Sequence, residues 1–166
     1  AEKQSENVHN TFGKVEWVTI FFFVGLFIAV KGIEEAGLLE ILADKALDLT
    51  GGDLTLTAMT ILWVSAIASA LVDNIPFVAT MIPLIKSMAP TFGGAENLAP
   101  LWWSLALGAC LGGNGSLVGA SANLIVAGFA ERAGHRIRFL PFMAAAFPLM
   151  ILSILIASLY IYMRYL

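Results

Sequence analysis

The feature that most constrains this chain is a series of apolar stretches, each close to the length that a helix needs to cross a bilayer. A spanning helix takes about 20 apolar residues to cover ~30 Å of hydrocarbon. Such stretches predict spans at 17–33 and 140–163. Of all residues, 59% are hydrophobic and 13% are charged, which would leave a water-soluble monomer with too much exposed apolar surface. The sequence therefore predicts an all-α membrane protein with several spans.

Charge and cysteine content exclude several classes of function. The formal net charge is −3 at pH 7 and no run of consecutive basic residues occurs, so nucleic acid is not an expected partner. The single cysteine, Cys110, cannot form an internal disulfide or a thiolate metal site. The chain has no strand before its glycines to form a phosphate loop and no nucleophile elbow. We expect neither an enzyme nor a bound cofactor.

Two polar segments lie near the N-terminus. Residues 1–14 are polar and mixed in charge, with no cleavage site after the apolar stretch that follows, which indicates a cytoplasmic linker rather than a secretory signal. The stretch 34–49 alternates charged and apolar residues at helical spacing, which predicts a helix lying in the membrane interface. Its expected apolar side consists of Leu38, Leu39, Leu42, Ala46 and Leu49.

A pair of short apolar limbs predicts a re-entrant hairpin. The first limb is 54–71, and the second, 77–88, covers only about 18 Å as a helix, too short to cross unaided. Asp73 and Asn74 stand between the limbs, where an ionisable group costs several kcal/mol. Asp73 either serves only as the cap of the second helix, with Pro76 in its first turn, or also directs a carboxylate oxygen into a cavity.

A second apolar helix is interrupted in the middle of the membrane. It begins at 101–111, stops at GGNGS (112–116) and is expected to resume over 117–131. Polar side chains gather at this break: Asn114, Ser116, Ser121 and Asn123. Non-helical backbone at this depth is tolerated only where protein or a watery cavity covers it. The alternative is close helix packing through the GxxxG pair Gly115 and Gly119.

The basic residues indicate an orientation. Arg132, Arg136 and Arg138 cluster before the last span, whereas the loop 89–100 has no basic residue. The excess predicts that the loop 131–139 is cytoplasmic. The linker 1–14 would then also be cytoplasmic, while the hairpin and the C-terminus would open to the outside.

Two segments resemble the signature segments of the ion transporter superfamily: SALVDNIPFVATMIPLI (69–85) and ALGACLGGNGSLVGASANLIVAGFAERAGH (106–135). The resemblance is to the branch of the arsenite permeases and NhaD-type sodium/proton antiporters, which includes the melanosomal P protein. It implies two inverted repeats, each with a re-entrant hairpin and a broken helix whose tips meet at a midplane site. Residues 15–166 would form the C-terminal transmembrane half, with hairpin and broken helix moving as one unit.

The resemblance also implies a secondary active transporter of an inorganic ion or small oxyanion, working as an antiporter coupled to H⁺ or Na⁺. The related dicarboxylate branch has Ser-Asn-Thr motifs where this chain has Asp73 and Asn74, which favours Asp73 as the H⁺ or Na⁺ site. The expected binding residues are Ser69, Asp73, Asn74, Gly113, Asn114, Gly115, Ser116, Ser121 and Asn123. Alternatives are an anion or dicarboxylate symporter, a channel-like anion conductance, or a structural membrane subunit.

The expected partners follow from the same resemblance. They are the N-terminal half of the same transporter, the lipid bilayer, and a second copy in a homodimer. The expected location is the bacterial inner membrane, crossed several times.

Overall fold

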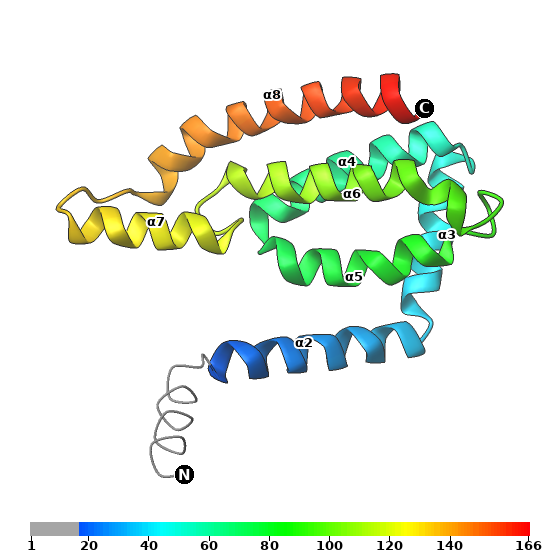
Figure 1. Ribbon diagram of the computed structural model, residues 1–166, viewed down its shortest axis with the longest axis horizontal. Helices are drawn as coiled ribbons and strands as arrows, with labels where there is room; N and C mark the ends of the chain where they lie inside the picture. Colours follow the sequence, from blue (N-terminus) through cyan, green and yellow to red (C-terminus); the bar gives the residue numbers. More distant parts are fainter. Residues whose placement is uncertain (1–16) are drawn as a thin grey trace, which may run out of the picture.

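A computed structural model describes residues 17–166, so the linker expected at 1–14 lies outside the described residues (Figure 1). Within this part of the chain every regular element is helical. In chain order the elements are α2 (Trp17–Glu35), α3 (Leu38–Thr50), α4 (Leu54–Leu71), α5 (Asn74–Ser87), the 3₁₀ turn η1 (Ala95–Leu98), α6 (Ala99–Gly112), the 3₁₀ turn η2 (Gly113–Gly115), α7 (Ser121–Arg132) and α8 (Phe139–Tyr165). The all-helical class expected from the sequence is confirmed for these residues.

Two helices of the described part are long and apolar enough to cross a bilayer, judged by length and composition. They are α4, with 18 residues, and α8, with 27 residues. At 1.5 Å per residue, α4 extends about 27 Å and α8 about 40 Å. Together with the family evidence given below, they make this chain part of a membrane protein.

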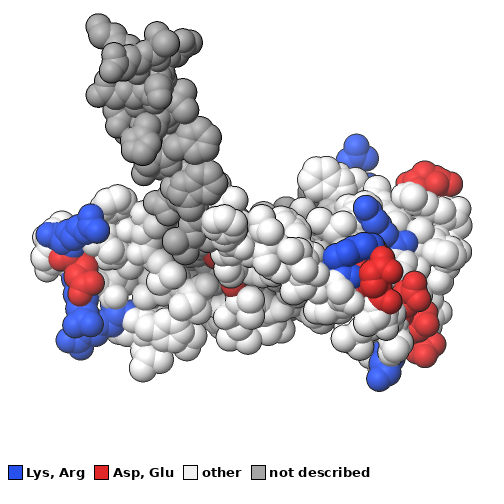
Figure 2. Space-filling model, turned by 90° about the horizontal axis from the view of Figure 1, so that it is seen from below, with Lys and Arg blue, Asp and Glu red and all other residues white. Residues whose placement is uncertain are grey.

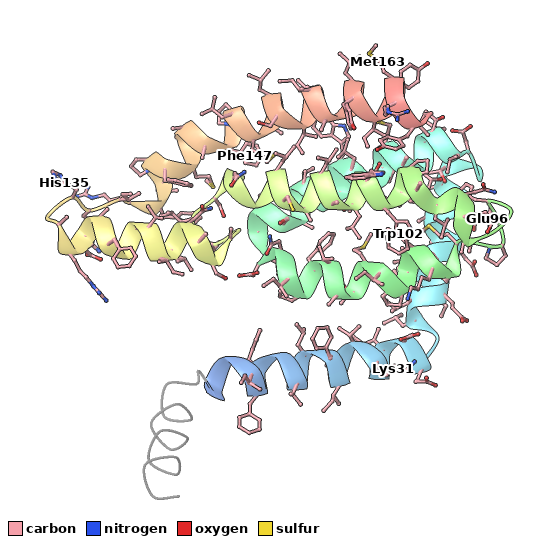
Figure 3. The ribbon with its side chains drawn as sticks, viewed as in Figure 1. Lys31, Glu96, Trp102, His135, Phe147 and Met163 are labelled. Atoms are coloured by element: carbon pink, nitrogen blue, oxygen red, sulfur yellow. The ribbon has the colours of Figure 1, made fainter. Side chains whose placement is uncertain are left out.

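Charged side chains gather at the two ends of the molecule and leave an apolar band between them (Figure 2). One end holds the C-termini of α2, α5 and α8, the N-termini of α4 and α6, and α3 (Figures 1 and 3). The charged residues of this end are Lys31, Glu34, Glu35, Glu40, Asp44, Lys45, Asp48, Asp53, Lys86, Glu96 and Arg164. The opposite end carries Glu131, Arg132, Arg136 and Arg138 around the α7–α8 loop. Acidic residues dominate the first end and arginines the second.

Helices α4 and α6 run parallel and pack more closely than ordinary side chains allow. A Cβ atom at Gly108 would lie 2.5 Å from the carbonyl oxygen of Leu62, and one at Gly112 would overlap the backbone of Ala66. Small residues at such an interface let helix backbones approach each other. Helix α8 covers the pair with its own buried residues, Met150, Ile154 and Ala157.

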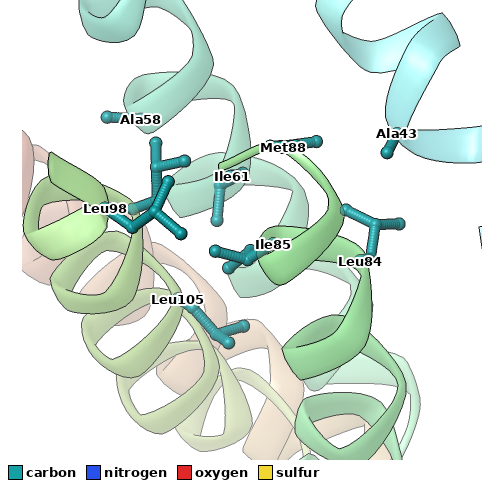
Figure 4. Packing of buried hydrophobic residues seen from close by; sticks show 9 residues of the cluster. Ala43, Ala58, Ile61, Leu84, Ile85, Met88, Leu98 and Leu105 are labelled. Atoms are coloured by element: carbon teal, nitrogen blue, oxygen red, sulfur yellow. The ribbon is translucent and has the colours of Figure 1, made fainter. Parts of the chain in front are cut away.

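A second cluster of buried residues joins α3, α4, α5 and α6 at the acidic end (Figure 4). Helix α3 contributes Ala43, which is 1% exposed. The apolar side expected for this helix is therefore only partly right, because Leu39 is buried and Ala46 half-buried while Leu38, Leu42 and Leu49 are exposed. The helix has two apolar sides, and the side with the small residue at 43 packs on the hairpin.

A hydrogen-bonded corner fixes α3 to α4. Gly51 and Gly52 turn the chain with φ angles of 61° and 68°, which glycine adopts without steric cost. The buried hydroxyl groups of Thr50 and Thr57 lie 2.8 Å apart, and Thr50 also donates to the carbonyl of Ala46 at 2.9 Å. Because the hydroxyl pair lies between the two helices, α3 is tied to the start of the hairpin.

Candidate site at the hairpin turn and the helix break

The hairpin turn is built around the carboxylate of Asp73. Helix α4 ends at Leu71, and Asp73 caps α5 by accepting a hydrogen bond from the backbone N–H of Ile75 at 3.1 Å. The expected capping role is confirmed. The second limb begins at Asn74 rather than at 77 as expected, because this cap and Pro76, whose φ is already helical, start the helix earlier.

The helix break is longer than the sequence predicts. Helix α6 ends at Gly112, and α7 begins at Ser121 rather than at 117. The hydroxyl of Ser116 explains the difference, because it donates to the carbonyl of Ala70 at 2.5 Å and accepts from the N–H of Gly119 at 3.1 Å. These bonds hold the chain after 116 against the last turn of α4 in an extended form.

Gly119 matters here for a reason other than the GxxxG packing that its spacing indicated. A Cβ atom at this position would lie 2.6 Å from the carbonyl oxygen of Gly113 and 2.7 Å from that of Ser69. No side chain fits between these backbone atoms without displacing one of them. The spacing of glycines after 112 was the available signal, but it does not indicate which backbone would approach.

One hydrogen bond connects the hairpin turn directly to the broken helix. The hydroxyl of Ser121 donates to Oδ2 of Asp73, across 48 positions of sequence. The two oxygens of this half-exposed carboxylate therefore face the first turns of two helices, α5 and α7. Helix N-termini carry unpaired N–H groups and a partial positive charge, which favour an anionic group.

The side-chain amide of Asn123 spans the break. Its Nδ2 donates to the carbonyl of Gly113 at 3.0 Å and to the carbonyl of Ser116 at 2.9 Å. Ser69 adds a parallel tie between helices, since its hydroxyl donates to the carbonyl of Ala109 at 2.7 Å. The turn and the break are thus held together by side-chain bonds to backbone oxygens.

Most of the predicted site residues are brought together, and two are not. Those joined at the turn and the break are Ser69, Asp73, Gly113, Ser116, Ser121 and Asn123, with Gly115 packed against Ala70 and Met150. Within residues 17–166, the side chains of Asn74 and Asn114 take no part in these bonds. Asn114 is exposed, and Asn74 lines an apolar groove of about 300 Å³ with Phe27 of α2.

The chemistry available at this place is that of one carboxylate among neutral oxygen and N–H groups. Of all Asp, Glu, Lys and Arg residues within 17–166, Asp73 alone belongs to neither charged end. No group of three His, Cys, Asp or Glu side chains able to hold a metal was found in the described part of the chain. A cation at this place would be held by Asp73 with hydroxyl and carbonyl oxygens.

These features define a helical membrane protein with a polar break inside its apolar band. The sequence profile of the family described as "Citrate transporter" matches residues 2–108. The chain belongs to this family, within the ion transporter superfamily. The superfamily expected from the signature segments is therefore confirmed.

Curated relatives include both bacterial and animal proteins. An uncharacterized transporter of Mycobacterium tuberculosis is 45% identical over 151 residues, which cover 91% of this chain and 35% of the relative. A 46 kDa membrane protein of Mycobacterium leprae is 40% identical over 152 residues, or 92% of this chain and 35% of the relative. The P protein of Homo sapiens is 39% identical over 153 residues, or 89% of this chain and 18% of the relative. The chain thus spans about a third of the mycobacterial relatives and less of the P protein.

Proposed function

We propose that this chain forms part of a secondary active transporter that moves an inorganic ion or small oxyanion in exchange for H⁺ or Na⁺. The observation that carries the proposal is the bond between Ser121 and Asp73. It places the one charge of the apolar band where a helix turn meets a helix break. Ionisable groups at membrane depth mark ion pathways and proton relays, and broken helices form the binding sites of transporters.

The same reasoning proposes how the chain sits in the membrane. Arginines dominate the end that holds the α7–α8 loop, and short loops rich in arginine and lysine stay in the cytoplasm. The hairpin of α4 and α5 would then enter from the opposite side and end inside the membrane as a re-entrant element. An N-terminal half with an inverted copy of these elements would cover the exposed polar groups of the turn and the break.

The decisive experiment replaces the carboxylate by an amide. Asp73→Asn in the full-length protein, reconstituted in liposomes, keeps a residue that caps helices well but removes the charge. We expect gradient-driven flux to fall at least about tenfold, measured with imposed Na⁺ and pH gradients. Coupled flux equal to that of the wild type would refute the proposal.

A matched control is available in the same hairpin. Asp53 caps α4 by accepting from the backbone N–H of Leu56 at 2.8 Å, and it lies at the charged end. Asp53→Asn therefore removes the same charge from the same kind of cap outside the apolar band. It should leave coupled flux unchanged, which separates loss of a cap from loss of the site.

A second candidate substrate is a carboxylate anion, carried by symport. The family description names citrate, and the first turns of α5 and α7 present N–H groups beside the turn and the break, which favour anions. Competition by citrate for the flux, with a dependence on the Na⁺ gradient in the same direction, would favour this candidate. Flux that neither saturates nor couples to a second ion would indicate a channel, and no flux from the full-length protein would indicate a structural subunit.

A further inference from the structure

A break inside a membrane helix leaves backbone carbonyls without helical partners. The carbonyls of Gly113 and Ser116 lie in the segment between α6 and α7, where the regular helix is lost. An unpaired backbone group in an apolar environment costs free energy comparable to a lost hydrogen bond. Whatever satisfies these two oxygens also determines the shape of the break.

Both oxygens are satisfied by one side chain. Asn123 lies in the first turn of α7, and side chains on a helix lean toward its N-terminus, so the amide reaches back over the break. It donates to Gly113 O at 3.0 Å and to Ser116 O at 2.9 Å. An amide has only two N–H hydrogens, and these two bonds use both.

The same turn of α7 carries the donor to the hairpin carboxylate. Ser121 is two positions before Asn123, and its hydroxyl bonds to Asp73. Since α7 has no buried residue along its length, packing farther along the helix does little to fix its first turn. The bonds of Asn123 to the break are therefore the main restraint on where the Ser121 hydroxyl stands.

We propose that Asn123 is a positioning residue rather than a solute ligand: it pins the break and so fixes Ser121 against Asp73. This inference rests on the proposed function for its effect on transport, but the pinning itself does not depend on it. Partners that orient a ligand typically change ion affinity by about 10–100-fold when removed. The groups left free to meet a solute are then those of Asp73, Asn74, Asn114 and Ser121.

The transport test uses Asn123→Asp, which keeps the shape and removes both donors, and Asn123→Ser, which keeps one donor. In liposomes with the full-length protein, the concentration of Na⁺ or H⁺ for half-maximal flux should rise about 10–100-fold for Asn123→Asp and less for Asn123→Ser. Asn97→Asp is the matched control, because the Asn97 amide also donates to a backbone carbonyl, Phe92 O at 2.9 Å, but at the acidic end. Lower maximal flux with an unchanged ion requirement would overturn the positioning role.

A second measurement does not need transport. With the exposed Cys110 changed to serine, a cysteine at Val118 in the break reports how tightly the segment is held. Val118 is exposed, so its thiol reacts at a rate set by the motion and local environment of the break. Asn123→Asp should change the maleimide labelling rate at least about threefold, whereas Asn97→Asp should not. An equal rate in both variants refutes the pinning, whereas absent flux in the wild type refutes only the proposed function.

Discussion

The close contact between α4 and α6 gives a prediction whose size follows from the structure. A Cβ atom at Gly108 would lie 2.5 Å from Leu62 O and 2.8 Å from Ser65 Cβ. Ordinary contact begins at 3.4 Å, so Gly108→Ala must separate the helices by about 0.9 Å, because a backbone oxygen cannot rotate away. Such overpacking typically costs about 1–3 kcal/mol.

The matched variant is Gly128→Ala in the interior of α7, where an added Cβ atom has nothing within 4 Å. Replacing glycine by alanine inside a helix gains about 1 kcal/mol in either helix, so this gain cancels in the comparison. Gly108→Ala should therefore be less stable than Gly128→Ala by about 1–3 kcal/mol. At about 2–4 °C per kcal/mol, thermal unfolding followed by circular dichroism in detergent resolves the difference. Equal unfolding temperatures for the two variants would refute the argument that backbone contact holds α4 to α6.

Three further predictions concern single contacts. Ser121→Ala removes the hydroxyl donor to the hairpin carboxylate, and the loss of about 1 kcal/mol should change the ion requirement for flux about fivefold; an unchanged requirement would contradict this. Thr57→Val breaks the buried pair with Thr50 at 2.8 Å and should lower unfolding stability by about 0.5–1.5 kcal/mol, a loss that thermal unfolding should detect. Leu49→Lys, at a position 88% exposed, should change detergent stability by less than about 0.5 kcal/mol, whereas Ala43→Leu, at a position 1% exposed, should cost about 1–3 kcal/mol; the reverse order would contradict the assigned face of α3.

The helices and the polar turn were predictable because each depends on local chemistry. The limits of α4, 54–71, agree with those expected from its apolar run, and α8 begins and ends within two residues of the expected span. Asp73 could be identified as a helix cap because Asp followed by Pro in the first turn is a local signal. These features depend on residues within one or two turns of each other.

The features that could not be predicted depend on contacts between distant segments. The packed side of α3 was misassigned because two of its sides are apolar, and only the position of the hairpin decides which one is covered. Ser116 was expected to line the binding site, yet its hydroxyl is used by Ala70 and Gly119. No spacing in the sequence shows that residues 46 positions apart share a hydrogen bond.

The late start of α7 is the error with the greatest consequence for the site. Had the helix resumed at 117, Ser121 would lie one turn inside it, about 6 Å along the axis from the first residue. Its hydroxyl would then compete with the helix's own carbonyls instead of reaching Asp73. The extended segment after Ser116 therefore puts the end of α7 beside the carboxylate, and that segment exists because Gly119 fits against the backbone of Gly113 and Ser69. The chemistry proposed for Asp73 thus depends on two small residues that no ion needs to touch.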